Sequence, residues 1–111
     1  GAVPRAVAAH HDAGATVAAV CTGGMLLAAA GLLDGRPAVT HAGAVADLRE
    51  TGADVRDEAR LVDDGDVLTA GGVTSGLDLA LHLVEREAGA AVADRVATTI
   101  EYERQHEAYT A

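Results

Sequence analysis

Residues 16–27, TVAAVCTGGMLL, join an apolar strand pattern directly to a helical one through the single cysteine of the chain, Cys21. Residues 17–20 include no polar side chain, which is typical of a central parallel strand covered on both faces. Gly23 and Gly24 allow a tight turn, and the apolar residues 25–30 favour a helix. This stretch therefore predicts a strand, a sharp turn carrying a thiol and a helix, which limits the fold to the α/β class.

The predicted position of Cys21 suits a nucleophile. The thiolate is the reactive form of cysteine, and the N–H groups at a helix start favour a thiolate and can stabilise an oxyanion. Thr22 follows directly, and its N–H lies where nucleophile elbows place an oxyanion donor. Two alternatives stay open: Cys21 as a small buried hydrophobic residue and Thr22 as a helix cap.

His41 is the second candidate for chemistry. It follows a predicted strand over residues 37–40, and the ends of neighbouring parallel strands lie at one edge of the sheet, where ligands bind. A histidine there could pair with the thiolate of Cys21 or move a proton. The alternative is a histidine at a strand end that bonds only to backbone.

The remaining pattern alternates helices and strands. Helices are expected over residues 4–13, 43–50, 76–87 and 91–106, an extended segment over 53–56, and a hairpin of strands 59–63 and 66–70 joined by Asp64-Gly65. We expect Thr74 or Ser75 to cap the third helix, with Leu77, Leu81 and Val84 on its core face. The acidic residues 54–66 are predicted to form a solvated rim, and His10 and His11 to lie on the surface.

Composition excludes several classes of function. Seventeen acidic residues against eight basic ones give a formal charge of −9, and the chain has only two aromatic residues, so nucleic-acid binding through this segment is not expected. No apolar run approaches the roughly 18 residues of a membrane span. The absence of a signal-peptide pattern and the lone cysteine favour the cytoplasm. We expect no cofactor and no metal site.

Five short motifs together resemble the ThiJ/PfpI superfamily, which has the class I glutamine amidotransferase-like fold, and within it most resemble the isonitrile hydratase branch. The motifs are VCTGG at 20–24, AAGLLDG at 29–35, VTH at 39–41, AGGVTSGLDLAL at 70–81 and IEY at 100–102. The resemblance implies that Cys21 and Thr22 are catalytic. It implies supporting roles for His41, Gly23, Gly72 and Thr74, and Asp78 is expected to support the pocket from its helix.

The resemblance also implies an activity. Isonitrile hydratases add water to an isonitrile to give an N-substituted formamide, so a small-molecule substrate and, in the intact form, a homodimer are expected. Three alternatives stay open: another cysteine-dependent enzyme acting on glyoxals or peptides, the ligand-sensing domain of an AraC-type transcriptional regulator, and an inactive fragment.

Family members possess a first half that contributes strands and an acidic residue over the thiol, and no carboxylate here matches that motif. Residues 1–111 are therefore expected to form the carboxyl-terminal half of a single ThiJ/PfpI domain. The expected architecture is a partial flavodoxin-like sandwich, with a parallel sheet, helices on both faces and a β-hairpin. Without neighbouring strands, residues 16–20 are expected to expose an apolar edge.

Overall fold

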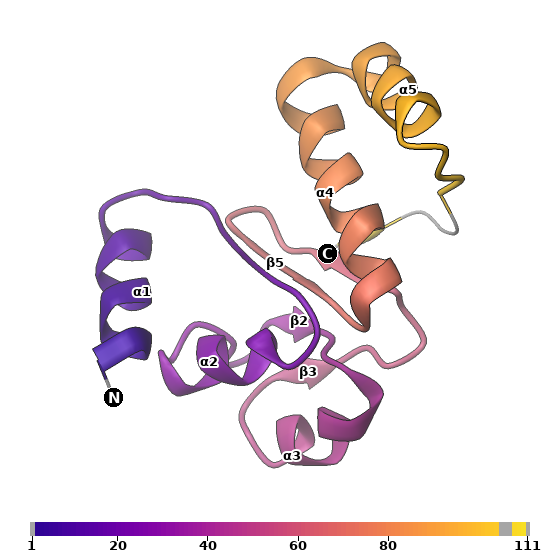
Figure 1. Cartoon of the computed structure of the whole chain (residues 1–111). Helices are drawn as coiled ribbons and strands as arrows, with labels where there is room; N and C mark the ends of the chain where they lie inside the picture. Colours follow the sequence, from indigo (N-terminus) through magenta and orange to yellow (C-terminus); the bar gives the residue numbers. More distant parts are fainter. Residues whose placement is uncertain (1, 105–107, 111) are drawn as a thin grey trace.

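A computed structural model describes residues 2–104 and 108–110, without the side chains of Val73 and Thr74 (Figure 1). The elements in chain order are α1 (Ala2–Asp12), β1 (Val17–Ala19), α2 (Gly23–Ala29), β2 (Pro37–Ala38), the 3-10 helix η1 (Ala42–Ala44), α3 (Val45–Arg49), β3 (Asp54–Val55), β4 (Leu61–Asp63), β5 (Val67–Ala70), α4 (Val73–Ala88), α5 (Ala90–Thr99) and β6 (Tyr109–Thr110). Among the described residues, no helix is both long and apolar enough to cross a bilayer.

Four strands form the main sheet, in the order β1-β5-β4-β6. β1 pairs with β5 in parallel, β4 pairs with β5 antiparallel, and β4 pairs with β6 in parallel. β2 and β3 form a separate parallel pair. The predicted hairpin is confirmed as β4 and β5: Gly65 takes a positive φ of 82° in its turn, and its N–H donates to Asp63 Oδ1 at 2.8 Å.

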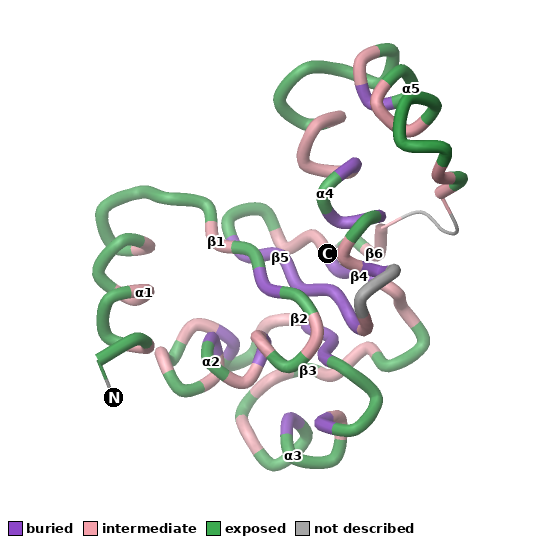
Figure 2. Tube along the Cα trace, in the orientation of Figure 1, coloured by how far each residue is buried: buried purple, intermediate pink, exposed green. Residues whose placement is uncertain are grey.

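β5 is the strand that helices cover on both faces, and all four of its residues are buried (Figure 2). Because alternate side chains of a strand point to opposite faces, Val67 packs with Leu27 of α2 and Leu48 of α3. Leu68 packs on the other face with Leu79 of α4. The predicted α/β sandwich with helices on both faces is confirmed.

β1 differs from the sequence prediction of a fully covered strand. It lies at the edge of the main sheet, and Ala18 and Val20 are exposed, Val20 by 44%. A run of apolar residues indicates that a strand is buried by other elements, but it does not identify which elements bury it. The apolar edge expected for this segment is present.

The two last helices also depart from the prediction. α4 begins at Val73 and not at Gly76, so Ser75 lies inside its first turn, and Gly72 is the N-cap, without a side-chain cap hydrogen bond. Leu77 is 41% exposed, and the buried face carries Asp78, Leu79 and Leu81. The core face of α4 therefore includes the polar residue Asp78, which a pattern of apolar residues does not reveal, and it excludes Leu77.

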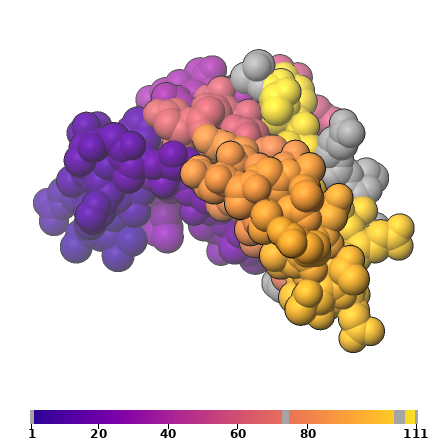
Figure 3. All heavy atoms as spheres, turned by 90° about the horizontal axis from the view of Figure 1, so that it is seen from above, coloured from indigo at the N-terminus to yellow at the C-terminus, as the bar shows by residue number. Residues whose placement is uncertain are grey.

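Helix α5 ends at Thr99, short of the predicted 106, and residues 105–106 of that prediction lie outside the described chain. α4 and α5 pack against each other and project from the sheet (Figure 1). Seen from above, this pair and the amino-terminal helix α1 occupy opposite ends of a molecule of 38 × 30 × 24 Å (Figure 3).

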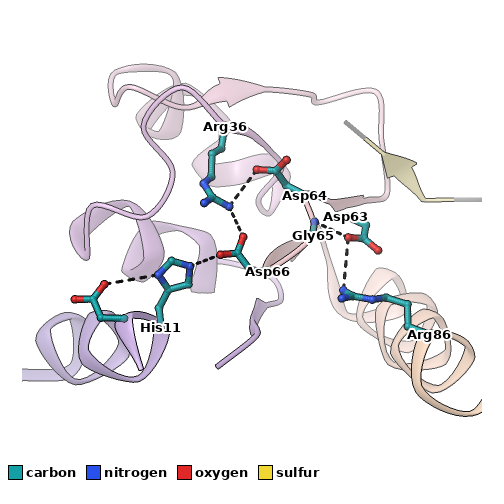
Figure 4. Close-up of polar contacts among 8 residues, drawn as sticks. His11, Arg36, Asp63, Asp64, Gly65, Asp66 and Arg86 are labelled. Carbon is teal, nitrogen blue, oxygen red and sulfur yellow. Dashed lines mark hydrogen bonds and ion pairs between the residues drawn. The ribbon is translucent and has the colours of Figure 1, made fainter. Parts of the chain in front are cut away.

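The acidic hairpin turn is ion-paired and is not simply a solvated rim (Figure 4). Asp66 accepts from His11 Nε2 and from Arg36 Nη1, both at 2.6 Å. His10 is exposed as predicted, and His11 lies at the surface with its side chain partly covered, 17% exposed, by the contact with Asp66. On the other side of the turn, Asp63 contacts His82 at 2.6 Å and Arg86 at 3.5 Å.

Asp66 predicts a pH-dependent contribution to stability. The hydrogen bond from Arg36, and then that from His11, lower its pKa to about 2. Because the pKa is lower in the folded state, the contribution is present above the unfolded value of about 4 and is lost as the pH falls through about 2. We expect Asp66→Asn to lower the free energy of unfolding at pH 7 by less than about 1 kcal/mol, since the pair is half exposed.

Urea unfolding of both proteins at pH 7 and pH 2 measures this difference, which should largely vanish at the lower pH. Glu87→Gln, at an exposed position of α4, is the matched control and should change little at either pH. An equal cost of Asp66→Asn at both pH values would contradict the assignment.

Substitution of Asp78 is expected to lower the free energy of unfolding by more than Asp66→Asn does. Its carboxylate is fully buried and accepts from Arg60 Nε at 3.1 Å and Tyr102 Oη at 3.2 Å. Asp78→Ala removes the buried carboxylate from a pair whose other member, Arg60, is 26% exposed, so we expect it to destabilise by about 1–3 kcal/mol. Tyr102→Phe should cost about 1 kcal/mol.

The matched control for Tyr102→Phe is Tyr109→Phe, because the hydroxyl of Tyr109 makes no hydrogen bond to the described residues. Thermal unfolding of the three variants should rank Asp78→Ala lowest and Tyr109→Phe closest to the wild type. Equal melting temperatures for the two tyrosine variants would remove the proposed role of the Tyr102 hydroxyl.

Candidate functional site

The predicted strand, turn and helix are present around Cys21. β1 ends at Ala19, α2 begins at Gly23, and Cys21 between them takes a φ of +56°. Only Cys21 and Glu101 among the described non-glycine residues have a positive φ. This conformation costs about 1–3 kcal/mol, so the surrounding structure must hold it.

Hydrogen bonds from two other segments hold the backbone of Cys21. Its N–H donates to the carbonyl of Gly71, just before α4. Its carbonyl accepts from the N–H of His41 at 2.9 Å and from Thr40 Oγ1 at 2.8 Å. The elbow is thereby fixed to the end of β2 and to the start of α4.

The glycines after Cys21 allow close packing. A Cβ at Gly24 would lie 3.3 Å from both Thr40 Oγ1 and the carbonyl oxygen of Val39. A Cβ at Gly23 would lie 3.3 Å from the Cβ of Ala19. The first turn of α2 therefore packs closely on the segment after β2 at Gly24 and on the end of β1 at Gly23, where larger residues would crowd these contacts.

His41 lies beside the elbow as predicted, but its ring forms a hydrogen bond within its own loop. Its Nδ1 accepts from the N–H of Gly43 at 3.0 Å, at the start of η1. With Nδ1 as acceptor, the neutral ring carries its proton on Nε2. Within residues 2–104 and 108–110, the sulfur of Cys21 makes no hydrogen bond, so the structure brings the two segments together without a direct Cys–His pair.

The other candidate residues are placed as follows. Thr22 is exposed and occupies the N-cap position of α2, as the cap alternative predicts, although its side chain makes no cap hydrogen bond. Gly72 lies against the His41 ring: a Cβ at Gly72 would be 3.8 Å from His41 Cδ2. The side chain of Thr74 lies outside the described part of the structure. Cys21 is half buried, which argues against the alternative of a fully buried hydrophobic residue.

A surface hollow of about 360 Å³ lies next to this region. The described residues that line it are Val39, Thr40, Ala42, Val45, Asp57, Ala59, Arg60, Gly71, Gly72 and Ser75. Sequence reasoning missed Arg60 and Ser75 as lining residues. Asp78, which was expected to support the pocket from its helix, does not line the hollow but binds the lining residue Arg60. Among the described residues, no three histidine, cysteine or acidic side chains gather as metal ligands do.

Residues 2–86 match the DJ-1/PfpI family. The isonitrile hydratase of Pseudomonas putida is 43% identical over 86 residues, which are 78% of this chain and 37% of that protein. The HTH-type transcriptional regulator GbdR of Pseudomonas aeruginosa is 37% identical over 92 residues, 82% of this chain and 25% of the regulator.

A crystal structure of a ThiJ/PfpI family protein from Pseudomonas syringae superposes with a TM-score of 0.71 at 36% identity, covering 80% of this chain and 36% of that one. The chain thus spans about a third or less of the length of these relatives. The matched segment includes the Cys21 elbow and the strands and helices that position it. This chain belongs to the DJ-1/PfpI family.

Proposed function

We propose that this chain carries the reactive cysteine of an isonitrile hydratase-like hydro-lyase, with Cys21 as the nucleophile. The observation that carries the proposal is the φ of +56° at Cys21. It is held by the hydrogen bond that the Cys21 N–H donates to the Gly71 carbonyl and by those that the Cys21 carbonyl accepts from His41 and Thr40. A strained residue over-determined by its surroundings is typical of functional sites. The 43% identity to an isonitrile hydratase supports the choice of reaction.

The proposed reaction has two stages. The thiolate of Cys21 attacks the terminal carbon of the isonitrile, that carbon takes up a proton, and a thioimidate with a new C–S bond results. Water then adds to the same carbon, nitrogen takes up a proton, and the C–S bond breaks to return the thiol and release the N-substituted formamide. The sum is one isonitrile plus one water to one formamide.

We assign Thr22, at the start of α2, to stabilising negative charge that develops on the substrate. His41 can donate a proton from Nε2, because Nδ1 is used by Gly43. We assign supporting roles to Gly23, which packs on Ala19, to Gly72, which lies against the His41 ring, and to Thr74. No cofactor enters this scheme.

The chain covers only 37% of the matched hydratase, so we extend the proposal to its context. We place residues 1–111 as the carboxyl-terminal half of a single domain whose other half supplies an acidic group over the thiol. The exposed edge at Val20 supports this arrangement. In its intact form we expect a cytoplasmic homodimer.

A second candidate is a ligand-sensing domain, which the match to GbdR supports. The two candidates differ in turnover, because a sensor binds a small molecule without converting it. The same substrate assay therefore distinguishes them.

We expect Cys21→Ala and Cys21→Ser to abolish formamide production from cyclohexyl isocyanide, because neither side chain provides a thiolate. Chromatography of the formamide measures it, in the 111-residue chain and in any longer natural protein that contains it. Thr99→Ala on α5, far along the chain from Cys21, is the control and should retain activity. Undiminished turnover by Cys21→Ala would eliminate the nucleophile role, and binding without turnover by the wild type would favour the sensor.

The elbow also predicts a gain in stability on substitution. Cys21→Gly should raise the free energy of unfolding by about 1 kcal/mol relative to Cys21→Ala, because glycine adopts a positive φ without steric cost. Both variants lack the thiol, so the difference in their stability reports the cost of the positive φ at this position. Urea unfolding measures the difference, and an equal or lower stability of Cys21→Gly would show that the elbow is not strained.

A further inference from the structure

The hollow beside the start of α4 has two kinds of wall. Its apolar wall is formed by Val39, Val45 and Ala59, among others, and its polar wall includes Ser75 and Arg60. Its volume of about 360 Å³ is within the range of small-molecule sites. The thiol of Cys21 does not line the hollow, although Thr40 and Gly71, which bond to the Cys21 backbone, do.

Ser75 is the feature that points to a ligand. It is only 5% exposed, and among the described residues its hydroxyl has no hydrogen-bond partner. In the described part of the chain, every side-chain oxygen that is fully shielded from solvent has a hydrogen-bond partner. Because the Ser75 hydroxyl has none, its oxygen must be in contact with accessible space. Because Ser75 lines the hollow, that space is the hollow, and the hydroxyl is free to donate into it.

The same wall contains the amino-terminal end of a long helix. α4 has sixteen residues, and its N-cap, Gly72, provides no side-chain hydrogen bond. The first N–H groups of a helix have no intrahelical acceptor, and the helix dipole adds partial positive charge there. Gly71 and Gly72 bring this end to the hollow without side chains that would cover it.

The full charges around the hollow are already balanced in pairs. Arg60 binds Asp78, and Asp57 accepts from Arg49 Nη2 at 2.7 Å. The hydrogen bond from Arg49 also lowers the pKa of Asp57, so that pair stays ionised near neutral pH. What is left without compensation is the partial positive charge of the α4 amino terminus and the donor of Ser75, and both favour an oxyanion.

We propose that this hollow binds a small organic carboxylate. One carboxylate oxygen accepts from Ser75 Oγ, the first-turn amides of α4 stabilise the charge, and the apolar substituent packs on Val39, Val45 and Ala59. The proposal does not require the isonitrile chemistry at Cys21, although Gly72 borders both sites.

Titration of the 111-residue chain with benzoate, followed by ¹H–¹⁵N correlation spectra, tests this site. Saturable shifts are expected at Gly71, Gly72, Ser75 and Gly76, and the neutral analogue benzamide should bind at least about tenfold more weakly. Ser75→Ala should weaken benzoate about tenfold, because it removes a hydrogen bond to a charged group. Thr99→Ala, which removes a hydroxyl from α5, should bind like the wild type.

Ala42→Leu provides a second variant, because Ala42 is exposed and the larger side chain extends into the hollow. It should weaken benzoate even if Ser75→Ala fails to fold. Shifts that do not saturate, equal affinity for benzamide, or unchanged affinity in either folded variant would overturn the proposal.

Discussion

The hydrogen bonds at the backbone of Cys21 fix the relative positions of the segments that form the site. Its N–H bonds to Gly71 before α4, and its carbonyl accepts from Thr40 and His41 after β2. These partners lie far apart along the chain, so the elbow conformation depends on the assembled fold and not on the local sequence. A positive φ at a residue with a side chain persists under such constraint.

Local turn chemistry could be predicted from the sequence, and strand neighbours could not. The Asp64-Gly65 hairpin is found because Gly65 adopts the positive φ that its turn requires. The strand before Cys21 was recognised from its apolar residues, yet its exposure at Val20 follows from its edge position in the sheet. Sheet order is set by pairing between distant segments, and a run of apolar residues contains no information on which segment pairs with it.

The candidate site likewise contains features that could be predicted from local sequence and features that could not. The cysteine turn followed by a helix is determined by adjacent residues and was predicted, although the helix begins at Gly23, which was expected to belong to the turn. For His41, a hydrogen bond to backbone was one of the two alternatives left open, and the structure shows Nδ1 accepting from Gly43. The 3-10 turn in which Gly43 lies is not indicated by the pattern of apolar residues. Ser75 was mistaken for a cap because Thr and Ser are common caps, whereas the helix starts at Val73 and buries Ser75 on the same face as Asp78 and Leu79.

The excess of acidic residues has a structural role at the hairpin turn. Asp66 binds His11 of α1, a helix without a fully buried residue, while Asp63 binds His82 of α4. Partly exposed ion pairs contribute at most about 1 kcal/mol each, so the two apolar clusters on either face of β5 must supply most of the stability. The ion pairs join α1 and α4 to opposite sides of the same hairpin turn.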